Sequence, residues 1–140
     1  MPSISSFILC DSIVNIQSPP NGNIPQLISP QAVLRPPFIP GTFSFGIAMC
    51  IVGLQAQQRN IFMFQIHAPS GDIIQNSGEI DFGELPPDDS MPEKYNGFVV
   101  SSDIRNLEIR TEGEYTIELF INSNSIGKCI IPIYKRNEMK

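Results

Sequence analysis

The sequence predicts an all-β fold: a two-sheet antiparallel β-sandwich of about seven to nine strands, immunoglobulin-like or of a similar type. Thirteen prolines and ten glycines in 140 residues disfavour helices and suit short strands joined by turns. Apolar side chains recur at every second position in several stretches, which is the period of a strand with one buried face. Hydrophobic residues make up 41% of the chain, enough for one core, so we expect a single domain spanning residues 1–140.

The N-terminal part predicts one strand followed by a long irregular segment. Apolar residues cluster in Phe7–Ile16, which is the expected strand. Residues 18–40 contain seven prolines, and proline lacks the N–H that a strand ladder needs. We therefore expect a long loop over residues 18–40, with a short extended piece around Ala32–Arg35.

The clearest alternation lies in the middle of the chain. Within Gly41–Leu54, large side chains alternate with small ones, so the large ones share one face of a strand. The large residues are Phe43, Phe45, Ile47, Met49 and Ile51, and the small ones are Ser44, Gly46, Ala48, Cys50 and Val52. A second strand is predicted at Ile61–His67. A Pro-Ser-Gly-Asp turn at residues 69–72 then returns the chain at Ile73-Ile74, which predicts a hairpin.

The second half predicts further short strands separated by polar turns. They are expected at Ile80–Phe82, Leu107–Arg110, Tyr115–Ile121 and Lys128–Tyr134. Residues 83–97 predict a second long loop, and a single helical turn near Ser102–Asn106 is the one helical element that the sequence allows. Pro132 cannot donate a ladder hydrogen bond, so the last strand is predicted to lie at a sheet edge.

Tyr115 opens a late strand directly after a turn. This position is typical of the tyrosine corner of immunoglobulin-like sandwiches, in which the hydroxyl bonds back to the backbone. The alternative is a core aromatic residue with a solvated tip. Ile117 stands where an antibody domain has cysteine, and the chain contains no tryptophan, so an antibody-type domain is excluded.

Charge is distributed very unevenly along the chain. Residues 1–58 contain only Asp11 and Arg35, whereas residues 72–118 contain twelve acids and three bases. The net charge of −5 argues against nucleic-acid binding, which needs clustered lysine and arginine. Lys128, Lys135, Arg136 and Lys140 form a small basic C-terminal end, interpreted as an edge-protecting, solubilising tail.

The uncharged strands of the first half are the most informative anomaly. A strand that faces water normally carries charges at every second position, but Phe43–Val52 has none, and Ile61–Met63 places apolar groups on both faces. Such strands are either central and covered on both faces, or they present an apolar face to another molecule. A subunit interface is therefore one hypothesis. The alternative is that the glutamine, serine and asparagine residues solvate the surface adequately.

Cysteine usage and hydropathy predict a cytoplasmic protein with no membrane segment. The N-terminal residues lack the basic and apolar regions of a secretory signal, and no apolar run approaches the roughly 20 residues that span a bilayer. The three cysteines, Cys10, Cys50 and Cys129, are odd in number and widely spaced. They are predicted to be small core hydrophobes rather than a disulfide framework.

Few residues suggest catalysis. His67 is the single histidine, and nothing near it in sequence resembles a nucleophile motif, so it is interpreted as a strand-end residue rather than a base. Glu79 and Asp81 are two apart and could pair as acid and base, although the outward side of a strand is the simpler interpretation. Zinc-ligand spacings and nucleotide-binding motifs are absent. We therefore predict no catalytic, cofactor-binding or metal-binding residues and no cofactor.

The acidic loop at residues 84–93 is the best candidate for binding a hard cation such as Ca²⁺, which takes several oxygen ligands. Its acids are Glu84, Asp88, Asp89 and Glu93. Their spacing matches no calcium motif, and a solvated acidic loop is the simpler interpretation.

Four short pieces resemble a family of small, uncharacterised bacterial β-sandwich proteins. These pieces are Cys10-Asp11 after the first strand, Phe38-Ile39-Pro40 before the long strand, Gly71-Asp72 in the hairpin turn, and Gly113-Glu114-Tyr115. The resemblance implies a cytoplasmic bacterial or phage-encoded protein. It implies no activity and assigns no functional residues.

The resulting hypothesis is a non-catalytic binding or assembly module that acts through a sheet face or through the long loops. We expect the partner to be a second copy of the chain or another protein, and neither a nucleic acid nor a membrane. Two alternatives remain: a structural subunit of a larger particle, such as a phage, and a small enzyme that uses carboxylates in a pocket.

Overall fold

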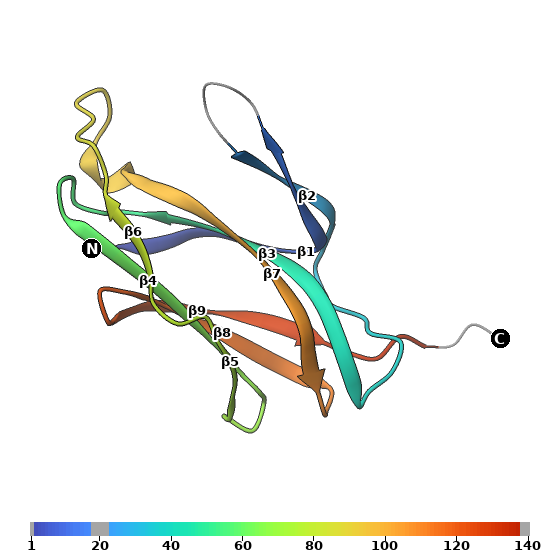
Figure 1. The fold of residues 1–140 in the computed structure, drawn as a ribbon. Coiled ribbons are helices and arrows are strands. Elements are labelled where there is room, and N and C mark those ends of the chain that lie inside the picture. Colours follow the sequence, from blue (N-terminus) through green and yellow to red (C-terminus); the bar gives the residue numbers. More distant parts are fainter. Residues whose placement is uncertain (1, 18–22, 138–140) are drawn as a thin grey trace.

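The computed structural model describes residues 2–17 and 23–137, which form two antiparallel sheets packed face to face (Figure 1). The first sheet has the strand order β2-β1-β3-β7. Its strands are β1 (Ser3–Gln17), β2 (Asn23–Gln31), β3 (Gly41–Val52) and β7 (Gly97–Ile109). This sheet contains the long, weakly charged strands of the first half of the chain.

The second sheet has the order β5-β4-β8-β9, with β6 also paired to β4. Its strands are β4 (Arg59–His67), β5 (Ile73–Asn76), β6 (Ile80–Glu84), β8 (Gly113–Ile121) and β9 (Asn124–Ile133). A three-residue 3₁₀ turn, η1 (Glu93–Tyr95), is the one helical element among the described residues. The predicted all-β sandwich is confirmed, with nine strands in the two sheets.

Strands β1, β3 and β7 lie side by side in the first sheet, and β4, β8 and β9 lie side by side in the second. The predicted tyrosine corner is confirmed, because the buried Tyr115 donates a hydrogen bond from its hydroxyl to the carbonyl oxygen of Thr111, four residues upstream, at 2.7 Å. This bond ties the start of β8 to the turn that precedes it.

The core lies between the sheets and follows the predicted alternation. The large residues of β3 are buried from Phe45 onward and face the buried residues of β4 and β8. The contributors from these strands are Phe45, Ile47, Met49 and Ile51; Phe62, Phe64 and Ile66; and Tyr115, Ile117, Leu119 and Ile121. Phe82 on β6 and Phe98 on β7 close one side of the sandwich, with ring centroids 4.7 Å apart.

The expectation of a loop throughout residues 18–40 is wrong for Asn23–Gln31, which is strand β2 and pairs with the second half of β1. Residues 18–22 lie outside the described residues. The two prolines within β2, Pro25 and Pro30, misled the sequence interpretation. A strand can contain them because β2 is at the sheet edge and has one partner, so not every N–H is needed.

The helical turn expected near Ser102–Asn106 is also wrong, because these residues continue β7. The strand bulges there: β3 residues Phe43 and Phe45 pair with Leu107 and Ile104, which leaves an extra residue on β7. Asn106 adopts a left-handed φ of 54°, and its N–H donates to the Ser44 hydroxyl at 2.9 Å. The segment expected to allow a helical turn instead forms a bulge in β7.

Strand β9 lies at the edge of the second sheet, as Pro132 predicts. The end of this edge is covered by the chain before β3. The Leu34 N–H donates to the Pro132 carbonyl at 2.9 Å, and the Tyr134 N–H donates back to Leu34 at 3.0 Å. The expected extended piece around Ala32–Arg35 is therefore a short parallel bridge that ties residue 34 to β9.

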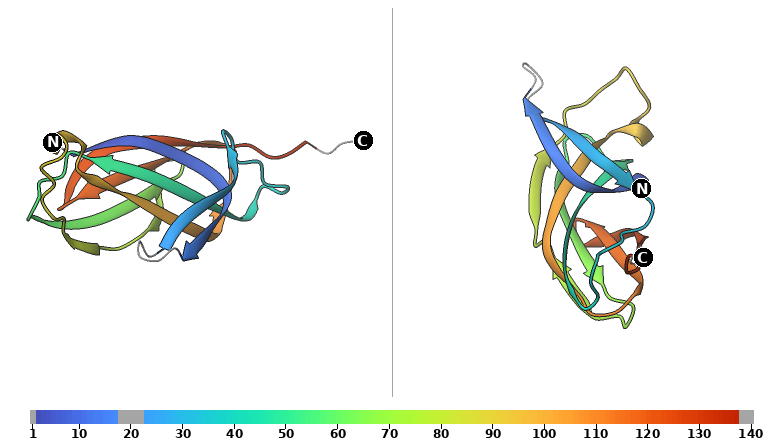
Figure 2. Two further views of the ribbon diagram at one scale, coloured as in Figure 1. Left: turned by 90° about the horizontal axis from the view of Figure 1, so that it is seen from above. Right: turned by 90° about the vertical axis from the view of Figure 1, so that its right-hand side faces the viewer.

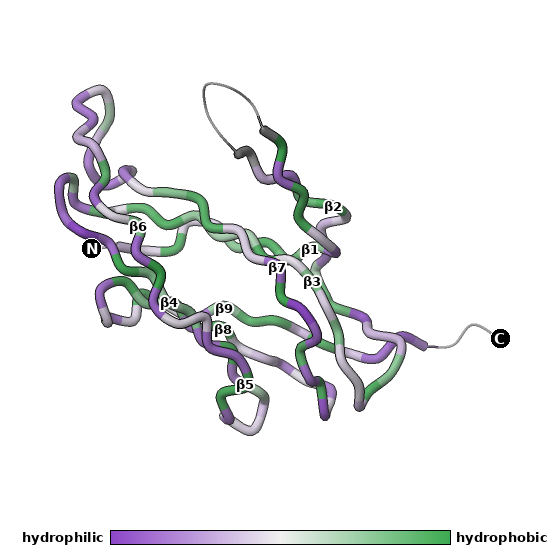
Figure 3. Tube along the Cα trace, in the orientation of Figure 1, coloured by the Kyte–Doolittle hydropathy of each residue, from purple (hydrophilic) through white to green (hydrophobic). Residues whose placement is uncertain are grey.

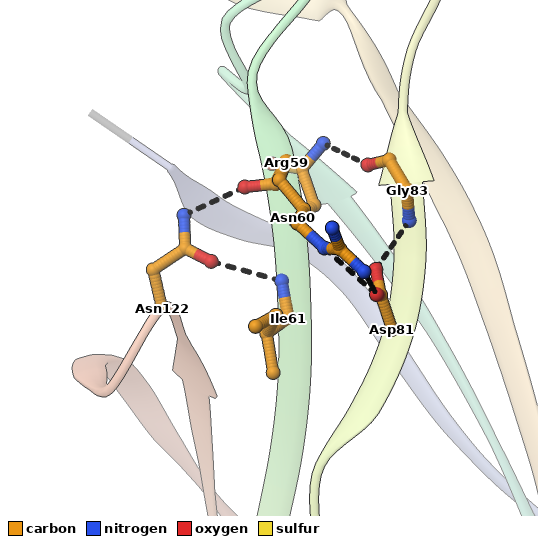
Figure 4. Close-up of polar contacts among 6 residues, drawn as sticks. All are labelled: Arg59, Asn60, Ile61, Asp81, Gly83 and Asn122. Carbon is orange, nitrogen blue, oxygen red and sulfur yellow. Dashed lines mark hydrogen bonds and ion pairs between the residues drawn. The ribbon is translucent and has the colours of Figure 1, made fainter.

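The start of β4 is held by asparagine side chains on both of its sides (Figure 4). Asn60 is 1% exposed, and its amide donates to the carbonyls of Gln58 at 3.0 Å and Gly83 at 3.3 Å. Asn122, in the left-handed turn between β8 and β9, accepts from the Ile61 N–H at 2.9 Å. These contacts fix where β6 and the β8–β9 turn meet β4.

We expect the substitution Asn60→Ala to lower the free energy of unfolding by about 1–3 kcal/mol, because it leaves two sheltered carbonyls without their donor. The matched control is Asn124→Ala, at an exposed position in the same sheet, which we expect to change stability by less than about 0.5 kcal/mol. Urea unfolding of both variants measures the difference. Equal midpoints would show that the Asn60 contacts add nothing.

Candidate docking face

The structure places His67 at the end of β4, next to Glu118 of β8 on the outer side of the second sheet. His67 Nε2 is buried, lies 3.8 Å from Glu118 Oε1, and has no hydrogen-bond partner among the described residues. The Ser125 hydroxyl donates to the other oxygen of Glu118 at 2.7 Å. In this group the acid lies between the serine and the histidine, whereas a hydrolytic triad needs the histidine in the middle.

Glu79 and Asp81 are not arranged as an acid–base pair. Asp81 lies on β6 and forms an ion pair with Arg59 (Figure 4), and it also accepts the Gly83 N–H at 2.8 Å. The Arg59 hydrogen bond, together with the Gly83 N–H, lowers the pKa of Asp81 below its usual range. A general acid needs a raised pKa, so this shift has the wrong direction for proton donation. Glu79 is exposed ahead of β6.

The acidic loop between β6 and β7 remains exposed. Asp88 accepts hydrogen bonds from the backbone N–H and the hydroxyl of Ser90, which lower the pKa of its carboxyl group. Within residues 2–17 and 23–137, no three His, Cys, Asp or Glu side chains are grouped closely enough to hold a metal ion. Asp88, Asp89 and Glu93 instead line a hollow of about 230 Å³, together with Ala56, Pro87, Met91 and Asn96.

All three cysteines are free, in agreement with the prediction that they form no disulfide framework. Cys10 is fully buried, and burial together with nearby Asp103 raises the pKa of its thiol. Burial also raises the pKa of Cys129. A raised pKa disfavours the thiolate, so neither of these cysteines has the character of a nucleophile. Cys50 is half-buried on the outer side of β3.

A cavity of about 410 Å³ adjoins the tyrosine corner, where the β4–β5 and β7–β8 turns meet. Its apolar wall includes Ile73, Ile74 and Tyr115, and its carboxylates are those of Asp72 and Glu108. Glu108 accepts a hydrogen bond from Arg110 at 2.9 Å. The carboxylates that line this cavity are thus few, and one of them is engaged in an exposed ion pair.

The outer face of the first sheet is the most extensive unusual surface. We call it the docking face and define it by the outward side chains of β1, β3 and β7: Ser6, Ile8, Cys10, Ser44, Gly46, Ala48, Cys50, Val52, Val99, Ser101 and Asp103. Asp103 is the one charged residue in this set. Val99 is 58% exposed and Ile8 is 41% exposed, so apolar side chains reach the solvent on this face.

The β1–β2 hairpin bends away from the sheet and crosses above the docking face. Figure 2 shows it passing over β3 and β7. The Ile13 N–H is 3.3 Å from the Asp103 carboxylate of β7, with which it hydrogen-bonds. At Gly46 an added Cβ would lie 2.7 Å from Cys10 Sγ and 2.8 Å from Ile13 Cγ1. Glycine at position 46 therefore provides the space in which the base of the hairpin sits.

This geometry partly answers why β3 is uncharged. The strand is central, between β1 and β7, and the chain's own hairpin covers it at Gly46. The burial extends to Ala48 and ends there, because Cys50 and Val52 are only half-buried and Val99 beside them is exposed. Both interpretations of the strand thus describe a part of it: one end is covered internally, and the other is open.

The hairpin itself adds apolar surface. Val14, Ile16 and Ile28 lie on the side opposite Ile13 and Leu27, and all three are exposed. In Figure 3 the hydrophobic colour continues from β1 into this hairpin, whereas much of the lower half of β7 is hydrophilic. The acidic loop before β7 rises on the same side of the first sheet as the hairpin (Figure 1).

Sequence interpretation found the open strand but missed the hairpin. A usable signal was Asn21-Gly22, a dipeptide typical of tight hairpin turns, between two segments with apolar residues. The contact between Ile13 and Gly46 has no local signal, because it joins residues that are distant in sequence.

No family model matches the chain, and no curated protein matches it in sequence. Within the described residues, the structure contains no helix with the length and apolar character needed to cross a membrane.

We expect Gly46→Val to displace the base of the hairpin and to cost about 1–3 kcal/mol, because the new side chain occupies the space of Cys10 and Ile13. The direct readout is labelling of Cys10 with a maleimide under native conditions, which we expect to be slow in the wild type and fast in the variant. Thr42→Val adds the same side chain at an exposed position of the same strand and is the control. Unchanged Cys10 labelling in Gly46→Val would contradict this seating of the hairpin.

Proposed function

We propose that the chain is a non-catalytic binding or assembly module and that another protein docks on the docking face, beside the β1–β2 hairpin. The observation that carries the proposal is that one end of this face, around Cys50, Val52 and Val99, carries no charge on a chain of net charge −5, whereas the paired Asp103 and Arg105 lie farther along β7. A face that meets water alone normally carries charges on alternate residues. Here Ile8, Val99 and the exposed side of the hairpin present apolar groups instead.

The chemistry of this surface defines the kind of partner. Interfaces between proteins have a centre depleted of charge and a polar rim. The docking face has such a centre at Cys50, Val52 and Val99, and Ser6 and Ser101 provide neutral hydrogen-bonding groups around it. The partner is therefore a protein with a matching uncharged surface. A second copy of the chain meets this condition, since its own docking face carries almost no charge.

The enzyme alternative has weaker support. Asp81 is paired with Arg59. In the group of Ser125, Glu118 and His67, the glutamate rather than the histidine lies in the middle. The cavity at the tyrosine corner is lined by few carboxylates. These arrangements support a binding role better than a catalytic one.

The test is native mass spectrometry of the protein purified from the cells that encode it, with Val99→Lys as the variant. Its matched control is Ile73→Lys, because Ile73 is 54% exposed on the other sheet, against 58% for Val99. We expect the wild type and Ile73→Lys to carry a stoichiometric protein partner, and Val99→Lys to lose it. A wild-type chain that is monomeric and unaccompanied at micromolar concentration would overturn the proposal.

A further inference from the structure

The most exposed large hydrophobic side chain lies away from the docking face. Phe38 is 70% exposed, at the tip of the loop that precedes β3. Two hydrogen bonds join this loop to the segment that follows β9. The Arg136 N–H donates to the Pro36 carbonyl at 2.9 Å, and the Arg35 guanidinium donates to the Lys135 carbonyl at 3.0 Å. Pro36, Pro37 and Pro40 further restrict the backbone. An aromatic side chain on a stiff loop loses little entropy on binding, as expected of an interface anchor.

The surroundings of Phe38 are positively charged. Residues 34–38 and 134–136 carry three bases, Arg35, Lys135 and Arg136, and no acid. Glu112 is the acid beside them, where it accepts the Lys135 N–H at 2.8 Å. The result is a locally positive surface around an exposed aromatic ring on a protein that is negative overall, and it favours a partner surface that is acidic at its rim and apolar at its centre.

The chain itself carries such a surface at its other end. The hollow of about 230 Å³ beside the acidic loop is lined by Ala56, Pro87 and Met91, by the carboxylates of Asp88, Asp89 and Glu93, and by Asn96. Residues 84–96 carry four acids and one base. The hollow thus offers a few apolar groups among carboxylates, and its negative charge complements the basic neighbours of Phe38.

The two surfaces cannot meet within one chain. Phe38 precedes the Gly41 end of β3, whereas the acidic loop leads into Gly97, which pairs with Val52 at the other end of that strand. The 12 residues of β3 separate them by about 40 Å. A contact between them must join two molecules, and because it uses different surfaces on each molecule it repeats head to tail.

We propose that copies of this chain associate head to tail, with Phe38 of one copy seated in the hollow between Pro87 and Met91 of the next. Arg35, Lys135 and Arg136 then face Asp88, Asp89 and Glu93 across the contact. The proposal is independent of the docking face, which contains none of these residues, and it describes an assembly that extends in one direction rather than a closed dimer.

The test is sedimentation velocity of the full chain over a range of concentrations at low and at high salt. We expect wild-type oligomers that grow with concentration and shorten at high salt, since the rim contacts are screened. Phe38→Ser and Met91→Lys should each weaken the contact about thirtyfold or more, as expected for an anchor residue and for a cation placed in its hollow. Ile130→Ser, at a position 55% exposed on β9, is the control and should assemble like the wild type.

Mixing the two variants gives the decisive result. Phe38→Ser retains an intact hollow and Met91→Lys retains an intact Phe38, so an equimolar mixture should form heterodimers but no longer chains. Wild-type protein that stays monomeric at low salt, chains that survive Phe38→Ser, or a mixture without heterodimers would each overturn the proposal. If this head-to-tail contact does not form, the proposal for the docking face is unaffected, and Val99→Lys tests it separately.

Discussion

Replacing Gly97 by alanine should lower the free energy of unfolding by about 3 kcal/mol and the melting temperature by about 10 °C. A Cβ at this position would lie 1.7 Å from the carbonyl oxygen of Ile51 and 2.9 Å from the Cα of Val52. Both atoms belong to the backbone of β3, so no side-chain rotation relieves the clash. The start of β7 must separate from β3, and the Phe98 ring that packs on Phe82 moves with it.

The control for Gly97→Ala is Gly41→Ala. At Gly41 the nearest atom to an added Cβ is the Phe38 carbonyl oxygen at 3.0 Å, so a shift of only a few tenths of an ångström would relieve the contact. We expect a loss of less than about 1 kcal/mol there. Thermal unfolding followed by circular dichroism compares the two variants. Equal melting temperatures would contradict the close approach of β7 to β3.

Tyr115→Ala should cost about 3–5 kcal/mol, because it removes a fully buried aromatic ring from the core and leaves a cavity. Tyr115→Phe separates the ring from the hydroxyl. It keeps the packing and removes only the 2.7 Å hydrogen bond to the Thr111 carbonyl, so we expect a loss of about 1–2 kcal/mol. Chemical unfolding of both variants measures the two contributions. If Tyr115→Phe were as stable as the wild type, the corner would be a packing feature alone.

The sequence predicts the sandwich because its central strands have an unmistakable period of two. The large residues of β3 and the Phe62, Phe64 and Ile66 series of β4 are buried as expected. Tyr115 after a turn was sufficient to suggest the corner, although the alternation of β8 would have accommodated a simple core tyrosine equally well. Prediction from a local sequence pattern succeeds where all the residues that form the pattern lie within one strand.

Prediction from the sequence fails where the position of a segment in the sheet decides whether that segment is a strand. Pro25 and Pro30 argue against a strand in general, but β2 has one partner and needs fewer donors. The polar residues near Asn106 favour a helical turn until β3 pairs with them, after which they form a bulge. Neither the edge position of β2 nor the pairing partner of residues 102–106 was evident from those residues alone.

The docking face was half predictable for the same reason. The small, uncharged side of β3 is visible in the alternation of residues 43–52, and it raised the question of what covers that side. The answer depends on Ile13 meeting Gly46 and on Asp103 accepting the Ile13 N–H, which are contacts between distant parts of the chain. The exposed Phe38 gave no sequence signal, because its exposure follows from how Arg35 and Pro36 bond to the chain after β9.

The central claim, that a protein partner covers the docking face, is tested most directly by labelling Cys50. This thiol lies on the face beside Val99, whereas Cys129 belongs to the second sheet, and both are half-buried in the isolated chain. Maleimide labelling is measured by mass spectrometry on the isolated chain and on the complex purified from the cells that encode it. We expect Cys50 to become protected in the complex while Cys129 labels at its original rate. A stoichiometric complex in which Cys50 labels as fast as in the isolated chain would contradict the claim.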